Sequence, residues 1–191
     1  MYCVNGSSMQ IKLKQIFYDL CHNIKNIAFI VLVRYVTITT KRLYLGNLKI
    51  ESVWELYSYR SSPLVEKYQS WKNYSYAEAF DLIVRMKDQD FHGQPGIYQW
   101  GIYLNQKLIG DIFWELEHNG VCWVGYTLNP NEWHKGYAYE AMQAFINYLH
   151  NVYRIQVFMA YILDENASSK HLIHKLGFSM LYPQVYIKNT W

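Results

Sequence analysis

Hydrophobic and polar positions fall into regular patterns only from residue 36 onward, and the first patterns predict a strand followed by a helix. Residues 36–45 are rich in Val, Ile, Thr, Leu and Tyr, which is the composition of a strand. Apolar residues then recur at helical spacing from Ile50 to Tyr57, and the Ser-Ser-Pro run at 61–63 ends this helix.

A second helix is expected from Ser75, because Ser75 and Glu78 have the spacing of a capping box. The two side chains of such a box satisfy backbone N–H groups that would otherwise lack partners. The apolar stripe expected to face the core of this helix consists of Tyr76, Phe80, Ile83 and Val84.

Three strand-like runs with short turns come next, at residues 98–104, 108–117 and 121–128. Asn119-Gly120 is a strong hairpin signal between the second and third runs. The three runs therefore predict an antiparallel meander.

After residue 128 the pattern changes to alternating helices and strands. The remaining elements are a helix at 136–151, a strand at 155–163, a helix at 167–176 that Gly177 ends, and a short strand around 185–187. A strand, a helix and a strand joined by short loops make a crossover, so strands 121–128 and 155–163 should run parallel. We predict an α/β fold with a mixed, mostly antiparallel central sheet, one parallel crossover and helices on both faces.

Residues 1–35 lack such signals and read as an N-terminal extension without an assigned order, which leaves 36–191 as the expected domain. The longest apolar run, Ile27–Val33, is far shorter than the roughly 20 residues of a membrane-spanning helix, and it has no small-residue cleavage site. Cys3, Cys21 and Cys122 show no paired spacing, which suits a reducing compartment. We expect a cytoplasmic protein that makes no membrane contact.

Composition narrows the function class. The chain is 51% hydrophobic and 17% charged, which excludes a disordered protein, and its net charge of +3 does not call for a nucleic-acid partner. His171 and His174 stand three residues apart on one expected helix, but no carboxylate or thiolate lies at ligand spacing. We therefore expect no metal site.

The stretch 125–141 is the most informative for chemistry, because it leaves a strand, turns and opens a helix. A helix N-terminus offers unpaired N–H groups and partial positive charge, which together bind phosphate. Gly136 would let a ligand approach the backbone closely, and Lys135 adds a cation. The stretch matches neither common nucleotide-binding motif. An ordinary strand-to-helix turn that uses one glycine remains an equal alternative on these grounds.

Trp133–Ala141 (W-H-K-G-Y-A-Y-E-A) resembles the acetyl-CoA signature of the GNAT superfamily of N-acetyltransferases, in its RimJ/RimL-like branch. Two further segments also resemble that branch. Residues 165–178 are similar to its E-N-x-x-S…K-L-G-F helix, and Thr39–Leu45 is similar to its first strand, T-x-R-L-x-L. The resemblance covers residues 36 to about 187.

The resemblance implies a GNAT fold of the α+β type and acetyl-CoA as co-substrate. It implies that backbone N–H groups in the loop hold the pyrophosphate, that the end of the preceding strand pairs with the pantetheine arm, and that two residues of the later helix bind near it. The implied residues are Trp133, His134, Lys135, Gly136, Tyr137 and Ala138 for the loop, Tyr126, Thr127 and Leu128 for the strand, and Asn166 and Ser169 for the helix. Asn166 also stands where a helix N-cap belongs, and both roles can coexist.

The implied reaction is direct attack of an amine on the acetyl carbonyl. Glu115 and Glu117 are the candidates for a general base, and the alternative is that they lie on a solvated strand face. Many members of the superfamily carry a tyrosine acid in the second helix, at the position of Ile173 here. Ser169 is the substitute that this branch suggests, with a hydrogen bond to sulfur as its role.

The leading function is therefore an acetyl-CoA-dependent N-acetyltransferase acting on a protein N-terminus or another primary amine. One alternative is a catalytically weak module that binds acyl-CoA as a sensor or scaffold, and a weaker one is an RNA-associated protein. Only one strand is expected after the last helix, which suggests that the domain lacks its final strand. Residues 27–33 or a second copy in a homodimer would then cover the sheet edge.

Overall fold

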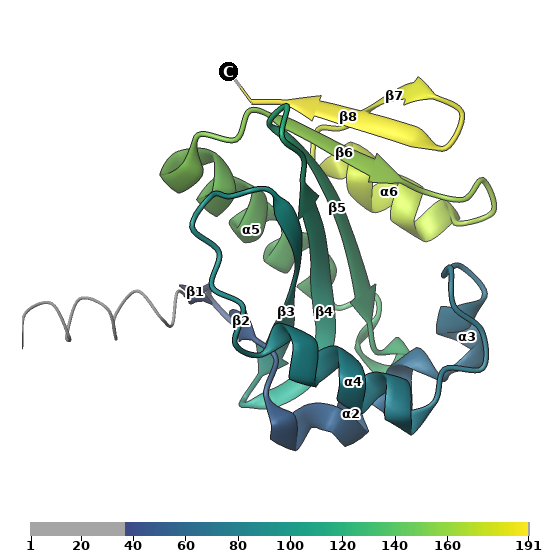
Figure 1. The fold of residues 1–191 in the computed structure, drawn as a ribbon. Coiled ribbons are helices and arrows are strands. Elements are labelled where there is room, and N and C mark those ends of the chain that lie inside the picture. The colour runs from purple at the N-terminus through teal and green to yellow at the C-terminus, as the bar shows by residue number, and fades with distance from the viewer. Residues whose placement is uncertain (1–36, 191) are drawn as a thin grey trace, which may run out of the picture. The chain divides into compact units, whose positions relative to one another are not determined.

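The computed structural model describes residues 37–190, which form one mixed sheet flanked by helices (Figure 1). In this part of the chain the sheet has eight strands in the order β1-β2-β3-β4-β5-β6-β8-β7. The strands are β1 (Ile38–Thr39), β2 (Tyr44–Asn47), β3 (Gly96–Leu104), β4 (Lys107–Leu116), β5 (Val121–Leu128), β6 (Val157–Tyr161), β7 (Ser179–Tyr182) and β8 (Val185–Asn189). The helices are η1 (Ile50–Ser52), α2 (Val53–Arg60), α3 (Pro63–Glu66), α4 (Tyr76–Met86), η2 (Pro130–Glu132), α5 (Tyr137–Tyr153) and α6 (Ala167–Lys175).

Every neighbouring pair of strands is antiparallel except β5 and β6, which run parallel and are connected through α5. On one face of the sheet, Trp114 of β4 packs against Phe145 of α5, with ring centroids 4.9 Å apart. On the other face, Tyr103 of β3 shares a buried core with Leu56 of α2 and Ile83 of α4. Helices therefore cover both faces, and the predicted mixed architecture is confirmed.

The stretch 36–45, predicted as one strand, contains a chain reversal between β1 and β2. The Thr40 hydroxyl accepts hydrogen bonds from the N–H groups of Arg42 and Leu43, at 3.4 and 2.9 Å. The Thr40 N–H donates to the Leu43 carbonyl. Threonine side chains that bond to nearby backbone in this way compete with strand pairing. The strand-like composition of residues 36–45 does not reveal this chain reversal.

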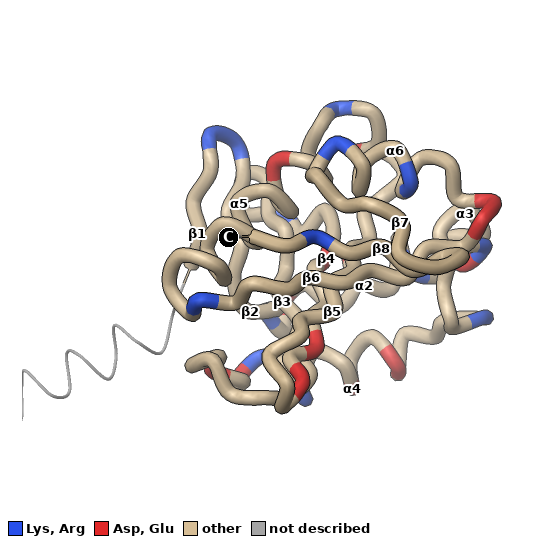
Figure 2. The backbone as a smooth tube through the Cα atoms, turned by 90° about the horizontal axis from the view of Figure 1, so that it is seen from above, with Lys and Arg blue, Asp and Glu red and all other residues tan. Residues whose placement is uncertain are grey.

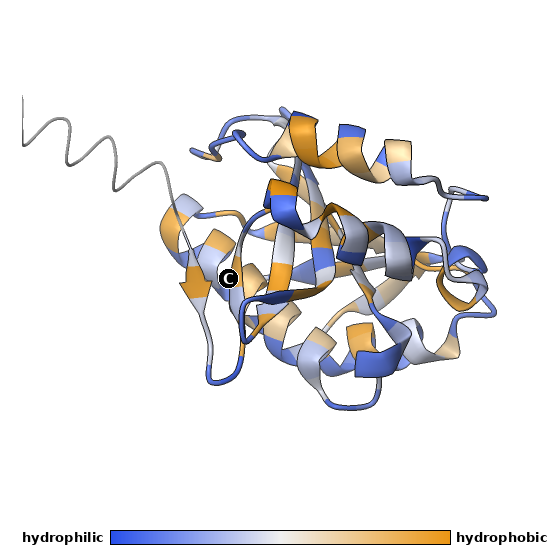
Figure 3. Ribbon diagram, turned by 90° about the horizontal axis from the view of Figure 1, so that it is seen from below, coloured by the Kyte–Doolittle hydropathy of each residue, from blue (hydrophilic) through white to orange (hydrophobic). Residues whose placement is uncertain are grey.

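Helix α4 begins at Ser75 as predicted, and both hydrogen bonds of the capping box are present. Its core-facing residues are Ala79, Leu82, Ile83 and Met86, so Ile83 is the one member of the predicted stripe that is buried. The other three are exposed: Tyr76 by 49%, Phe80 by 45% and Val84 by 43%. Helix α4 lies along the top of Figure 3, where hydrophobic and hydrophilic residues both occur along the visible ribbon. Spacing alone does not decide which of two apolar sides faces the sheet.

This corrected orientation predicts unequal effects for two neighbouring truncations in α4. Ile83→Ala should lower the free energy of unfolding by about 2–5 kcal/mol, because Ile83 is fully buried and its loss leaves a cavity. Val84→Ala should change it by less than about 0.5 kcal/mol, because this side chain is largely exposed. Urea unfolding followed by tryptophan fluorescence measures both, and equal effects would contradict the orientation.

A buried ion pair joins α2 to the sheet. Asp111 of β4 is 1% exposed, and Arg60 at the end of α2 is 6% exposed. Arg60 Nη2 donates to Asp111 at 2.7 Å, and Tyr59 and Gln99 donate to the same carboxylate. Burial lowers the pKa of Arg60, but the charge and hydrogen bond of Asp111, together with Tyr59 and Tyr74, outweigh this effect, so that the pKa lies above its ordinary value. Arg60 is therefore charged at every physiological pH.

Two strands follow α6 where the pattern predicted one. β7 and β8 form a hairpin, and β8 pairs with β6 on the side of β6 away from β5. The prediction missed β7 because its four residues are all exposed and show no alternation of apolar and polar positions. We expected a missing final strand because only one strand was predicted after α6. The structure has two strands there.

The N-terminal extension, with its apolar run at 27–33, lies outside the described residues, as does Trp191. Among the helices that are described, none is long and apolar enough to cross a membrane.

Candidate active site

A gap opens between β5 and β6 near the middle of the sheet. The two strands pair only from Val121 to Trp123 on β5, and residues 124–128 continue without a partner on that side among the residues that the structure describes. Asn129 N–H bonds to the Ile109 carbonyl, so every second residue of β5 turns its backbone toward β4 and those between turn toward the gap. Tyr126 is one of the latter, and its N–H and C=O are available to an extended ligand.

The loop after β5 leads into the N-terminus of α5. Gly136 is the N-cap of α5 at φ +80°, and it provides no side-chain cap. Within the described region, no protein group accepts a hydrogen bond from the backbone N–H groups of residues 134–139. These consecutive donors, with the positive end of the helix dipole, form a cradle for an anion.

The cradle is held from outside by the first hairpin. Arg42 Nη1 donates to the Lys135 carbonyl at 2.9 Å, and Arg42 Nε donates to Glu140 at 2.6 Å. The Thr40 hydroxyl donates to the same carboxylate at 2.6 Å. These contacts bind the Lys135 carbonyl to the first hairpin. Partial burial raises the pKa of Glu140, but the hydrogen bonds from Thr40 and Arg42 together outweigh this effect and lower the pKa. The sequence analysis missed this buttress, although Thr40, Arg42 and Glu140 all lie within motifs that it singled out.

Two loop side chains take positions that the sequence did not reveal. The Trp133 indole Nε1 donates to the Leu128 carbonyl at 2.8 Å, which clamps the loop to the end of β5. Lys135 Nζ pairs with Glu132 at 2.9 Å at the surface, where the Lys135 side chain is 51% exposed. The extra cation predicted for the loop therefore forms an exposed ion pair, and its role in binding a ligand stays a prediction.

Helix α6 borders the gap on its other side. Asn166 is the N-cap of α6, and its side-chain oxygen accepts from the Ser169 N–H at 3.1 Å. The Ser169 hydroxyl lies 3.0 Å from the Tyr126 hydroxyl of β5. Burial raises the pKa of Tyr126, and the hydrogen bond to Ser169 opposes part of this rise.

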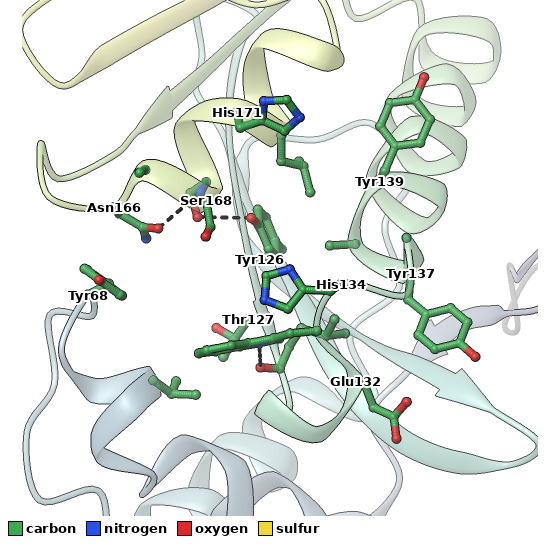
Figure 4. Close-up of a pocket in the computed structure, with 18 of the residues that line it drawn as sticks. Tyr68, Tyr126, Thr127, Glu132, His134, Tyr137, Tyr139, Asn166, Ser168 and His171 are labelled. Atoms are coloured by element: carbon green, nitrogen blue, oxygen red, sulfur yellow. Dashed lines mark hydrogen bonds between the residues drawn. The ribbon is translucent and has the colours of Figure 1, made fainter.

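These elements enclose a cavity of about 690 Å³, which is in the size range of ligand clefts. Figure 4 shows Tyr126 and His134 pointing into the cavity, with Asn166 and Ser168 on the side of α6 and Tyr68 across from them. Every residue predicted to bind the co-substrate lines this cavity except Lys135. The residues brought together are Tyr126, Thr127, Leu128, Trp133, His134, Gly136, Tyr137, Ala138, Asn166 and Ser169.

The predicted catalytic carboxylates lie outside the cavity lining. Glu117 accepts from Trp123 Nε1 at 2.8 Å and from Asn119, so its carboxylate belongs to the β4–β5 hairpin. Glu115 lies opposite Trp123 in the ladder, level with the last β5–β6 pair, and it is partly buried. Among the described residues, no side chain forms a hydrogen bond or ion pair with the Glu115 carboxylate.

Sequence reasoning also missed one wall of the cavity. Leu64 and Val65 of α3 and the following Tyr68 and Gln69 line it, and Gln69 Nε2 reaches Thr127 Oγ1 at 3.5 Å. The run at 61–63 does end α2, but Pro63 then begins α3. Proline at a first helical position was the available signal, because its missing N–H costs nothing there.

Three further features of the described region bear on other kinds of chemistry. No three His, Cys, Asp or Glu side chains gather there as metal ligands would. Burial raises the pKa of the Cys122 thiol to about 12, which makes it a poor nucleophile. Figure 2 shows lysines and arginines spread over many elements of this region, without a basic stripe.

The sequence was also compared with known proteins, and the matches agree with the site described above. Residues 42–179 match the model of the acetyltransferase (GNAT) domain family. The uncharacterized N-acetyltransferase p20 of Bacillus licheniformis is 30% identical over 145 residues, which cover 74% of this chain and 82% of that protein. The chain belongs to the GNAT acetyltransferase family, and is thus an N-acetyltransferase by family.

Solved structures agree in fold. A GNAT-family acetyltransferase from Bacillus anthracis superposes with a TM-score of 0.71 at 19% identity, covering 81% of this chain and 98% of that one. RimL, a ribosomal L7/L12 alpha-N-protein acetyltransferase solved with coenzyme A, gives 0.68 at 16% identity, with the same coverage of both chains. This likeness agrees with the RimJ/RimL-like motifs.

Proposed function

We propose that the protein transfers the acetyl group of acetyl-CoA to a primary amine, either a protein N-terminus or a small amine, by direct attack on the thioester. The observation that carries this proposal is the run of N–H groups at residues 134–139, where Gly136 opens α5, which have no partner within residues 37–190. These donors suit a pyrophosphate, and the unpaired side of β5 suits the pantetheine arm that follows it. The solved RimL complex, which holds coenzyme A, supports this assignment.

The direction of the cavity supports the same placement of the pyrophosphate and the pantetheine arm. The cradle lies at the end of β5 that is far from β6, and the gap narrows toward the last pair at Trp123. A pantetheine chain that starts at the cradle and pairs with Tyr126 would bring its thioester toward that narrow end. Acetyl-CoA supplies the activated acetyl group. The chain's own residues orient it and exclude water from it.

For the general base we propose Glu115, acting through a water molecule. It stands beside the narrow end of the gap, and its carboxylate has no competing partner among the described side chains. An α-amino group has a pKa near 8 and a lysine near 10.4, so an N-terminal amine needs the least help from such a base. Glu117 is the weaker candidate because its carboxylate holds the hairpin.

The two glutamates provide matched variants. Glu115→Gln should lower kcat/KM by about 10²-fold or more, because single acid–base groups usually contribute 10²–10⁴-fold. The kcat/KM of Glu117→Gln should stay within about threefold of the wild-type value, because Glu117 transfers no proton in the proposed mechanism. Initial rates of thiol release with one verified amine measure both. The reverse ranking would transfer the role of base to Glu117.

The proposal itself is tested by thiol release from acetyl-CoA over a panel of amines that includes peptides with free and blocked N-termini, lysine derivatives and polyamines. We expect release that depends on the amine and is strongest with unblocked α-amines. Tight acetyl-CoA binding without release from any amine would favour the acyl-CoA sensor, in which the same cradle serves binding alone.

A further inference from the structure

The hydroxyl of Tyr126 has a position that packing does not explain. Tyr126 lies three residues beyond the last β5–β6 pair, in the gap, and its ring points into the cavity (Figure 4). Its hydroxyl lies 3.0 Å from the Ser169 hydroxyl of α6. In the described region neither hydroxyl has another protein partner, so the pair keeps one hydrogen-bonding position open toward the cavity.

The proposed reaction needs a proton at this place. When the amine displaces the thioester, the electron pair of the carbon–sulfur bond passes to sulfur, which leaves as a thiolate unless it is protonated. A serine hydroxyl is a weak acid, whereas a phenol has a pKa near 10. The equivalent of the usual tyrosine acid on the second helix is Ile173, which is buried in the core. No acid can come from that position.

We propose that Tyr126 and Ser169 act as one proton-donating pair for the departing thiolate, with the Tyr126 phenol as the acid. The inference rests on the proposed function. In this step the amine nitrogen forms its bond to the acetyl carbon, the carbon–sulfur bond breaks, and the Tyr126 proton passes to sulfur. The phenolate regains a proton from solvent water through Ser169, and the proton lost by the amine passes through a water molecule to Glu115, which returns it to solvent. The net reaction moves one proton from nitrogen to sulfur.

Burial raises the pKa of Tyr126, so the phenol holds its proton at neutral pH until the thiolate develops, although the same shift makes it a weaker acid. The geometry that supports the assignment is fixed by Asn166. Its side chain accepts the Ser169 N–H and thereby fixes the first turn of α6, which holds the Ser169 hydroxyl against Tyr126.

Tyr126→Phe tests the proposal, because it removes only the hydroxyl. We expect kcat to fall by about 10²-fold, with the KM for acetyl-CoA within about threefold of the wild type. Ser169→Ala should reduce kcat as well, and the double variant should lose little more than the worse single variant, since two groups that act as a unit are not additive. Tyr161→Phe is the matched control: its hydroxyl bonds to Gln184 outside the cavity, and kcat should not change.

A second readout does not depend on turnover. Ultraviolet titration of the thiol of bound coenzyme A reports the pKa of that thiol. A hydrogen bond from the pair to the thiolate stabilises the charged form, so the thiol should bind its proton about tenfold more weakly in the wild type than in Tyr126→Phe. Absence of amine-dependent release in the wild type would reject the proposed function, and the titration would still test the pair. An unmoved titration, an unchanged kcat in Tyr126→Phe, or fully multiplicative losses in the double variant would each overturn the inference.

Discussion

Asp111→Asn should lower the free energy of unfolding by about 3–5 kcal/mol, which is the largest stability effect that we expect from any single substitution. The substitution keeps the shape of the side chain but leaves the Arg60 guanidinium, 6% exposed, without its counter-charge. Tyr59 and Gln99, which also donate to this carboxylate, would lose a charged acceptor. The midpoint and slope of urea unfolding measure the change.

The matched control is Asp88→Asn, which breaks an ion pair with Lys87 at an exposed site where Asp88 is 77% exposed. This pair should contribute less than about 1 kcal/mol, because solvent screens it. A second comparison is the double variant Arg60→Met with Asp111→Leu, which should recover only part of the loss: no charge then stays buried and unpaired, but the buried Tyr59 and Gln99 donors lose their acceptor. A loss of less than about 1 kcal/mol in Asp111→Asn would contradict the role of the pair.

Gly136→Val should weaken acetyl-CoA binding by tenfold or more, the largest effect on binding that we expect. At φ +80° a β-branched residue is strained, and a Cβ would also lie 3.4 Å from Arg42 Nη2. The contact with Arg42 is an ordinary van der Waals distance, so the strain lies in the backbone, and its relief turns the N–H groups of the cradle away from the ligand. Acetyl-CoA at 100 times its wild-type dissociation constant should stabilise the wild type by about 2.7 kcal/mol, and the variant by at least about 1 kcal/mol less.

Gly120→Val provides the control for strain alone. Gly120 has a φ of +84° in the β4–β5 turn, and no atom within 4 Å would meet its Cβ. Both variants should lose similar intrinsic stability, but Gly120→Val should keep the full shift in melting temperature with acetyl-CoA. A full shift in Gly136→Val would mean that the anion cradle lies elsewhere.

How far the fold could be predicted depended on local signals. The strand at 121–128 has the predicted bounds, because the Asn119-Gly120 turn and the alternation that follows it are both local. Helix α4 shows the limit: its cap was predictable, but which of its two apolar sides is buried depends on α2 and β3, which lie against it. β7 left no trace in the pattern because all of its residues are exposed.

The candidate site divides in the same way. Its glycine turn and helix start are contiguous in the chain, so the cradle could be predicted from 125–141. Its buttress joins Arg42 to Glu140, 98 residues away, and its α3 wall meets Thr127 through Gln69. Contacts of this kind depend on the complete fold. Motif resemblance identified the segments, but not that they touch.

One measurement tests the central claim most directly: single-turnover transfer from acetyl-CoA that carries an isotopic label in its acetyl group, with mass spectrometry of the amine and of the protein. We expect the label in the amide product, one acetyl group for each thiol released, and none on the protein, because the amine attacks the thioester directly. Thiol release without a labelled amine, or label retained covalently on the protein, would contradict direct acetyl transfer to an amine.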